Sequence, residues 1–198
     1  MINFVPEAAP LLRRWLLGLL SDSSELEELA TLLPEVAAMR GVPQRADFHA
    51  EGCVLTHTRL ALQALAESAD ERAIWAVLLH DIGKVATTLW QNDTWRSPGH
   101  AEAGAELVPS ILRRLGRADL IDDVVWLVRH HQFFLSWQNL DRGLSRRQLR
   151  FCRNPLFPLL IEVCRADGAG SLGSAKGAML ERVLALLAAE ASTATGPE

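Results

Sequence analysis

The sequence predicts an all-α protein folded as a single compact helical bundle. Hydrophobic residues make up 49% of its 198 residues, and the mean hydropathy of +0.09 is typical of a globular chain. Leu and Ala, which are strong helix formers, dominate the apolar residues. Apolar side chains recur with helical spacing, whereas the alternation of a strand is scarce. The length fits one domain over residues 1–198, with helices in 1–48 packed on a core at 49–170.

The first predicted helix follows Pro10 and is amphipathic. Arg13 and Arg14 interrupt its apolar run, which is too short to span a membrane, and no small-residue cleavage site follows it. The sequence therefore predicts neither a membrane span nor an export signal, and we expect a cytoplasmic location.

Capping residues and chain breaks mark the elements that follow. Ser24 and Glu27 form a capping-box pair that predicts a second helix, which runs towards Arg40 and stops at Gly41-Val42-Pro43. Further helices are predicted near residues 52–68, 70–83, 100–115, 118–132, 145–152, 155–166 and 174–190, with a second capping box at Ser145 and Gln148, a polar loop at 92–99 and a frayed tail from 191.

Charge and cysteine content narrow the functional classes. The net charge is −4 and no long basic run is present, so strong nucleic-acid binding is not expected. A small anionic substrate held by a few local cations and a metal remains compatible with this charge. Cys53, Cys152 and Cys164 form no C-x-x-C motif, so neither a disulfide framework nor a zinc finger is predicted.

A His-Asp pair ends one of the most apolar predicted helices. His80 and Asp81 follow the run AIWAVLL, and a carboxylate buried beside an imidazole is unfavourable unless a partner compensates it. A divalent metal is such a partner, and these side chains are suitable ligands. The alternative is a C-terminal turn in which His80 caps carbonyl groups and Asp81 points to water.

Two more candidate ligands lie on neighbouring predicted helices. His57 flanks the apolar stripe of the helix at 52–68, and Asp167 ends another apolar helix, where it could equally be an ordinary residue before a glycine turn. Three helices of a bundle can deliver ligands to one point. The sequence thus favours a metal site in which these residues meet the His80–Asp81 pair.

Five segments occur in an order that resembles a known family. They are HAEGCVLTHTRLAL, LLHDIGK, GHAEAGAEL, LVRHH and CRADGAG. Together they resemble the HD domain superfamily of metal-dependent phosphohydrolases, and in particular the version of that domain appended to bacterial tRNA nucleotidyltransferases. The resemblance covers roughly residues 49–170, and the all-helical fold that it implies agrees with the helical periodicity.

The resemblance implies a metal centre of one or two ions per chain. A principal site for a divalent metal (Mn, Fe, Co, Ni, Mg or Zn) would be formed by His57, His80, Asp81 and Asp167. Many members of the superfamily hold a second metal nearby. The matching residues here are His100 and one or both of His130 and His131, with Asp81 as the bridge.

The activity implied by the resemblance is hydrolysis of a phosphoester. The substrate would be a phosphomonoester or a cyclic or linear phosphodiester, with a nucleotide favoured over another small phosphorylated metabolite. Asp81 would hold the metal and help to orient the attacking water, and Lys84 would contact the phosphate. An ordinary solvated lysine is the alternative for Lys84.

Several specialised activities of the superfamily are not expected. Alarmone hydrolases carry acidic residues after the HD pair, whereas Ile82-Gly83-Lys84 follows here, and the GYP motif of cyclic-di-GMP phosphodiesterases is absent. Only 48 residues precede His49 and they resemble helices, so a nucleotidyltransferase head and CCA addition are not expected. A non-catalytic metal- or nucleotide-binding regulatory module is the main alternative. A structural helical protein is another, for instance a homodimer formed through Trp15, Trp90 or Trp95.

Other residues receive supporting interpretations. The aromatic residues Phe133, Phe134 and Trp137 could stack on a base, although packing in the core or against a partner is favoured. His49 is expected to cap the helix at 52–68, and Arg165 is expected to be a surface residue rather than a phosphate contact.

Overall fold

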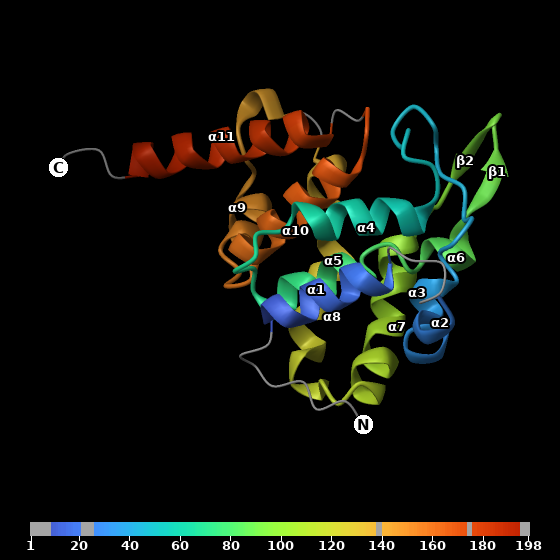
Figure 1. Ribbon diagram of the computed structural model, residues 1–198. Helices are drawn as coiled ribbons and strands as arrows, with labels where there is room; N and C mark the ends of the chain where they lie inside the picture. The colour runs from blue at the N-terminus through green and yellow to red at the C-terminus, as the bar shows by residue number, and fades with distance from the viewer. Residues whose placement is uncertain (1–8, 21–25, 138–139, 174–175, 195–198) are drawn as a thin grey trace.

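A computed structural model describes residues 9–20, 26–137, 140–173 and 176–194 of the chain. In these residues helices pack around a common core, and one two-stranded hairpin projects from the bundle (Figure 1). The predicted all-helical fold is confirmed.

The helices are α1 (Ala9–Leu19), α2 (Leu26–Leu32), α3 (Pro34–Ala37), α4 (Val54–Ala64), α5 (Glu71–Leu79), α6 (Lys84–Thr87), α7 (His100–Arg114), α8 (Ile121–His130), α9 (Arg146–Cys152), α10 (Phe157–Gly170) and α11 (Lys176–Ala194). Short 3-10 turns are η2 (Ala118–Leu120), η3 (Phe133–Ser136) and η4 (Leu140–Arg142).

Helix α5 forms the centre of the bundle. Every residue from Ala73 to Leu79 is buried, and the helix packs against α4, α8 and α10. The Asp70 carboxylate caps its start by accepting a hydrogen bond from the Arg72 amide at 2.8 Å. Because α5 is apolar on all sides, it is held at the centre, and the polar residues that follow it emerge inside the protein.

Two glycines allow the backbones around this point to approach closely. A Cβ atom on Gly83 would collide with the backbone carbonyl of His100 and lie 2.6 Å from the amide nitrogen of Gly104. A Cβ atom on Gly170 would lie 2.9 Å from the amide nitrogen of Ala61 in α4. Gly83 has a helical φ of −65°, so glycine is needed here for this close approach to α7 and not for an unusual backbone conformation.

The amino-terminal half departs from the predicted elements at a proline. The helix expected to run towards Arg40 is split, because Pro34 starts α3 after α2 has ended at Leu32. Proline lacks an amide hydrogen and disfavours helix continuation from the preceding turn. The capping pair Ser24 and Glu27 lies outside the residues whose side chains are described.

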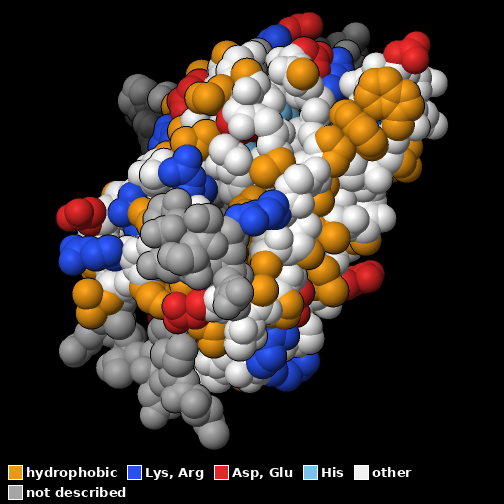
Figure 2. Space-filling view, turned by 45° about the vertical axis from the view of Figure 1, so that its right-hand side comes forward, with side chains coloured by type: hydrophobic (Ala, Val, Ile, Leu, Met, Phe, Trp, Pro, Cys, Tyr) orange, Lys and Arg blue, Asp and Glu red, His pale blue; other side chains and the backbone are white. Residues whose placement is uncertain are grey.

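Residues 92–99 were predicted to form a polar loop, but they contain the turn and the second strand of a β-hairpin. Strands β1 (Leu89–Gln91) and β2 (Thr94–Arg96) pair with Trp90 opposite Trp95. Asn92 and Asp93 form the turn with φ of 52° and 55°, values that suit a tight hairpin. Three-residue strands are too short to show alternation in the sequence. Figure 2 shows hydrophobic side chains gathered where this hairpin projects, and Trp90 is 58% exposed.

The carboxy-terminal helices follow the prediction more closely. The capping box of α9 is confirmed, since Ser145 Oγ accepts from the Gln148 amide and the Gln148 side chain accepts from the Ser145 amide. Helix α10 continues to Gly170, so Asp167 lies in its last turn rather than at its end. Helix α11 extends to Ala194, four residues beyond the predicted end, and the tail after it lies outside the described residues. Among the described residues, no helix combines the length and apolarity needed to cross a membrane.

Candidate metal centre

Side chains from three helices meet at the end of α5. His57 belongs to α4, His80 and Asp81 follow the last residue of α5, and Asp167 belongs to α10. His57 Nε2 lies 3.2 Å from His80 Nε2 and 3.0 Å from Asp167 Oδ1. His80 Nε2 lies 3.2 Å from Asp81 Oδ2. The four side chains predicted to form the principal site are thus adjacent and buried. That they bind a metal ion stays a prediction.

The second oxygen of Asp81 faces another group of nitrogens. Asp81 Oδ1 lies 3.4 Å from His100 Nε2 and 3.8 Å from His131 Nε2, and these two nitrogens are 3.4 Å apart. Within the described part of the chain, Asp81 Oδ1 is a buried oxygen with no hydrogen-bond partner. A buried acceptor without a donor is unfavourable. Asp81 therefore stands between two groups of ligand atoms, as the bridging role requires.

The tautomers of three histidines direct lone pairs at the cluster. Each ring donates Nδ1–H to the carbonyl oxygen three residues earlier, at 2.7 Å: His80 to Val77, His100 to Ser97 and His131 to Val128. Because a carbonyl oxygen only accepts, a neutral ring then carries its lone pair on Nε2, which faces the cluster. Burial lowers the pKa of His131 to about 3, so this ring is neutral. Converging nitrogen and carboxylate lone pairs are a donor set that fits a divalent cation.

Glu51 orients two histidines from outside the cluster. Its Oε1 accepts from His49 Nδ1 at 2.7 Å and from His57 Nδ1 at 3.0 Å, and its Oε2 accepts from the Leu172 amide at 3.0 Å. Burial opposes ionisation of Glu51, but these bonds outweigh it and lower its pKa to about 2. Burial likewise opposes a charged His57, yet its hydrogen bonds to Asp167 and Glu51 raise its pKa to about 9. His57 must therefore release a proton before its Nε2 can bind a metal.

Two lysines balance the buried carboxylates. Lys84 Nζ donates to Asp81 Oδ2 and to Gln44 Oε1, both at 2.7 Å, and Lys176 Nζ donates to Asp167 Oδ1 at 3.1 Å. Burial would raise the pKa of both aspartates, but neighbouring positive charge, including these ammonium groups, holds it well below the usual value. Lys84 is only 6% exposed, so it is not the solvated lysine considered as the alternative.

His130 does not reach the cluster. Its ring packs edge-on against Trp126 and Phe151, with ring centroids 5.0 and 5.2 Å apart. The adjacent His131, which is fully buried, provides the nitrogen that faces Asp81. The two positions are successive on a helix and so project on different sides, and the sequence left open which of them points inward. The structure decides for His131.

Other residues singled out in the sequence have clear positions. Phe133 and Phe134 are buried, and Phe133 packs with Trp137 in an aromatic cluster, which agrees with a packing role. His49 bonds to Glu51, whereas helix α4 has no side-chain cap at its start, so the predicted capping role is wrong. Arg165 is an exposed partner of Glu181 at 3.1 Å, as expected for a surface residue.

A cleft of about 990 Å³ opens beside His100. Its walls come from the starts of α7 and α9, from the end of α8 and from η3. The lining includes the cations Arg129 and Arg147 and the partly exposed rings of Trp137 and Phe151. His100 lines this cleft and also faces Asp81, so the cleft borders the candidate metal centre at His100.

Sequence reasoning missed Glu51, Lys176 and Gln44 as parts of the site. Glu51 lies within the HAEG segment, where its closeness to two histidines is a usable signal. Lys176 lies nine residues after Asp167 and beyond a glycine-rich segment, and Gln44 belongs to the segment before α4. No local pattern connects the last two residues to Asp81 or Asp167, because tertiary packing brings them together.

The chain matches one protein family and several curated relatives. The HD domain family matches residues 49–168. A multifunctional CCA protein of Alkalilimnicola ehrlichii is 35% identical over 162 residues, which cover 75% of this chain and 37% of the relative. A protein of the same name from Neisseria meningitidis is 36% identical over 156 residues, covering 75% and 36%. One from Halorhodospira halophila is 45% identical over 101 residues, covering 50% and 24%. The match thus spans 37%, 36% and 24% of the length of these three relatives.

These relatives overturn one expectation from the charge of the chain. The net charge of −4 and the lack of a basic run predicted no strong binding to nucleic acid. The relatives are multifunctional CCA proteins, a class of tRNA nucleotidyltransferase, and this finding contradicts the expectation that the chain does not bind nucleic acid. Net charge averages over the whole surface, whereas binding of a nucleic acid depends on the local distribution of cations, so a negative net charge does not exclude it.

Proposed function

This chain belongs to the HD domain family, and from that premise we propose that it is a metal-dependent phosphohydrolase. The main support is the paired arrangement of ligand atoms around Asp81. One carboxylate oxygen faces His57 and His80, and the other, which has no hydrogen-bond partner in the described residues, faces His100 and His131. A buried set of converging imidazole and carboxylate donors is well suited to a divalent cation.

The proposed centre holds one or two divalent ions. His57, His80, Asp81 and Asp167 would hold the principal ion, and Asp81, His100 and His131 would hold the second. When bound, the metal supplies Lewis acidity, which lowers the pKa of water and neutralises charge on phosphoryl oxygens. Imidazole and carboxylate ligands suit Mn, Fe, Co, Ni and Zn, and Mg is compatible with the carboxylates.

The residues of this chain would orient and neutralise the reacting groups. Asp81 is placed to hold an attacking water by hydrogen bonding, since its carboxylate lies between the two groups of nitrogens. Lys84 Nζ, 2.7 Å from Asp81 Oδ2, would steady a non-bridging phosphoryl oxygen by a charge-assisted hydrogen bond. The burial of the cluster strengthens both interactions, because it excludes bulk water.

The cleft beside His100 favours a nucleotide as the substrate. Trp137 and Phe151 are partly exposed aromatic residues that could contact a base, and Arg129 and Arg147 offer positive charge for further phosphates. Phosphomonoesters and cyclic phosphodiesters of nucleotides fit this combination. Because the relatives are multifunctional CCA proteins, the proposal includes a phosphate at the end of an RNA strand.

A substrate panel tests the proposal directly. Purified protein would be offered p-nitrophenyl phosphate, nucleoside monophosphates, nucleoside 2′,3′-cyclic phosphates and RNA with a terminal phosphate, each with Mn, Co, Ni, Mg, Fe or Zn. We expect metal-dependent release of phosphate or ring opening, reduced to background by Asp81→Asn. Asp122→Asn is the matched control, because Asp122 is an exposed carboxylate in the first turn of α8.

The same panel separates the enzyme from a non-catalytic module. Turnover that Asp81→Asn leaves intact would assign the activity to another protein or site. Metal and nucleotide binding without turnover of any substrate would favour the regulatory alternative over the proposed activity.

A further inference from the structure

The chain contains only two lysines, and both lie in the candidate metal centre. Its other eighteen basic residues, histidines aside, are arginines. Lys84 begins α6 and Lys176 begins α11, and their exposed fractions are 6% and 9%. Lysine differs from arginine in presenting a compact ammonium on a flexible stem. Its restriction to these two positions indicates a need for that group at the centre.

The two ammonium groups contact carboxylate oxygens that both lie near His57 Nε2. Lys84 Nζ is 2.7 Å from Asp81 Oδ2, an oxygen that also lies 3.7 Å from His57 Nε2. Lys176 Nζ is 3.1 Å from Asp167 Oδ1, an oxygen that also lies 3.0 Å from His57 Nε2. Each lysine therefore contacts a carboxylate oxygen that faces His57 Nε2. Lys176 Nζ also lies 3.3 Å from Ser171 Oγ.

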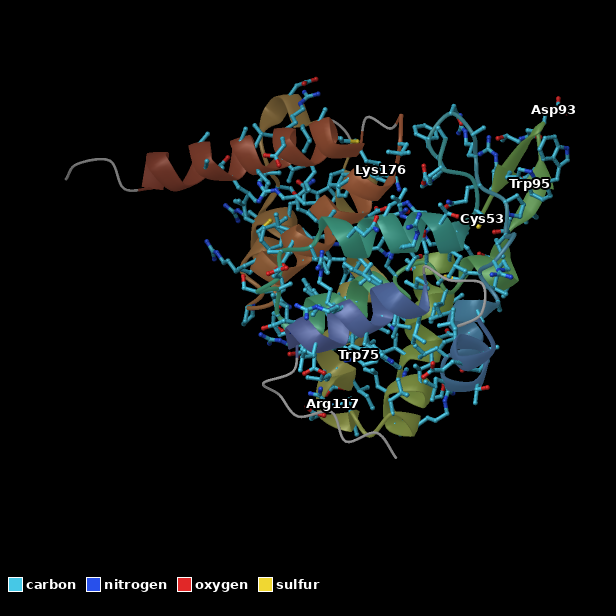
Figure 3. The ribbon with its side chains drawn as sticks, viewed as in Figure 1. Cys53, Trp75, Asp93, Trp95, Arg117 and Lys176 are labelled. Carbon is cyan, nitrogen blue, oxygen red and sulfur yellow. The ribbon has the colours of Figure 1, made fainter. Side chains whose placement is uncertain are left out.

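The positive charges of both lysines act on the same residue, His49. Burial lowers the pKa of His49 to about 4, and repulsion from the positive charges of Lys84 and Lys176 contributes to that shift. The two cations thus act on one region next to the cluster, although they come from helices 92 residues apart in sequence. In Figure 3, Lys176 lies at the start of α11, above α4.

The charge of the loaded centre requires an anion. Glu51, Asp81 and Asp167 are buried carboxylates and the two lysines are buried cations, so these five groups carry one net negative charge. A single divalent ion would make the total one positive, and two ions would make it three positive. Uncompensated charge is strongly unfavourable in a buried site. The substrate phosphoryl group is an anion of suitable charge.

We infer that Lys176 is a substrate-binding residue, which together with Lys84 binds the phosphoryl oxygens of the substrate. The inference rests on the proposed function. In the ion-free protein each ammonium group pairs with a metal-ligand carboxylate. A metal that binds the same oxygens would compete with this pairing and would repel the ammonium groups, which would favour an anionic acceptor in addition to the contacts with Gln44 and Ser171. Phosphoryl oxygens provide it, and a flexible lysine stem allows the small movement required.

Lys176 lies outside the residues that match the family. The match ends at residue 168, whereas Lys176 is supplied by α11, which packs on α10. A phosphate contact from α11 would therefore be a contribution of this chain beyond the matched domain, and α11 would be part of the functional unit.

Having two lysines makes a direct spectroscopic test practical. Protein labelled with ¹³C at lysine Cε gives two lysine signals, assigned with Lys176→Arg. Zinc, which is diamagnetic, would be added first and inorganic phosphate second. We expect zinc to shift both signals and phosphate to shift both again. A phosphate response confined to Lys84, or absent from both signals of the zinc-loaded protein, would overturn the inference. Failure of zinc to bind would instead overturn the proposed centre itself.

Binding measurements on variants separate a phosphate contact from a structural role. For zinc-loaded Lys176→Met, calorimetry should show phosphate affinity reduced about tenfold or more, as expected for loss of one charge-assisted hydrogen bond. Zinc affinity should be retained or increased, since the variant removes a competitor for Asp167. Arg165→Met, which removes an exposed cation from α10, should change neither affinity. Unchanged phosphate affinity, or parallel loss of zinc and phosphate, would show that Lys176 only supports Asp167.

Discussion

At the scale of single residues, Glu51 connects several parts of the centre. One carboxylate oxygen holds His49 and His57, and the other holds the amide of Leu172, in the segment that follows α10. Glu51 thus links the histidine on α4 to the helix that carries Asp167. Glu51 contacts His57 at Nδ1, whereas His57 Nε2 faces the aspartates of the centre. We therefore regard Glu51 as a positioning residue.

Glu51→Gln should weaken metal binding while leaving the fold intact. The amide keeps the shape of the side chain but loses the charge that orients His57, and loss of such an outer partner typically lowers metal affinity about 10–100-fold. Competition titration with a zinc indicator would measure the change. Glu67→Gln, at an exposed position after α4, is the matched control and should bind zinc like the wild type. Equal affinities for the two variants would contradict the positioning role.

At the scale of elements, the contact between the turn after α5 and the start of α7 determines how Asp81 and His100 lie relative to each other. Gly83 lies against the backbone of His100 and Gly104, so the turn that carries Asp81 can come within reach of His100 Nε2. The positions of these two ligands therefore depend on a backbone contact that only glycine permits.

Gly83→Ala should destabilise the protein, because the added methyl group would collide with backbone atoms that cannot rotate away. Overpacking of this kind typically costs about 1–3 kcal/mol, measured here as the free energy of unfolding in urea. Gly177→Ala is the control, since nothing lies within 4 Å of a Cβ there and the residue is exposed in α11. It should be neutral or stabilising by up to about 1 kcal/mol. Similar losses for both variants would show that the close approach is not the cause.

At the scale of the whole molecule, the centre joins elements from most of the chain. Helices α4, α5, α7, α8, α10 and α11 each contribute or adjoin a polar group of the cluster. Each must therefore be in place before a metal can bind with its full set of ligands. Metal binding and global folding are coupled in such an arrangement.

Zinc should raise the melting temperature of the protein. A ligand present at 100 times its dissociation constant stabilises the folded state by about 2.7 kcal/mol when the unfolded chain does not bind it. Thermal unfolding with and without zinc would measure the shift. Asp81→Asn should lose most of it, and Asp122→Asn should keep it. A full shift in Asp81→Asn would place the stabilising ion elsewhere.

The sequence alone determined the helical class and much of the candidate site. The apolar run before His80 requires a buried helix, and the capping box at Ser145 and Gln148 fixes a helix start through bonds between near neighbours. The ordered His and Asp motifs indicated the residues that meet at Asp81. These features are encoded locally, by periodicity and short-range hydrogen bonds, and they can therefore be recognised without knowledge of the fold.

Tertiary structure alone decided the remaining features. The choice of His131 over His130, the pairing of Lys176 with Asp167 and the approach of Gly83 to α7 depend on how helices distant in sequence pack together. Nothing in the neighbouring residues records these contacts, since each is set by the rotation and position of two packed elements. The sequence thus indicated which chemical groups meet, and packing in three dimensions determined which atoms face one another.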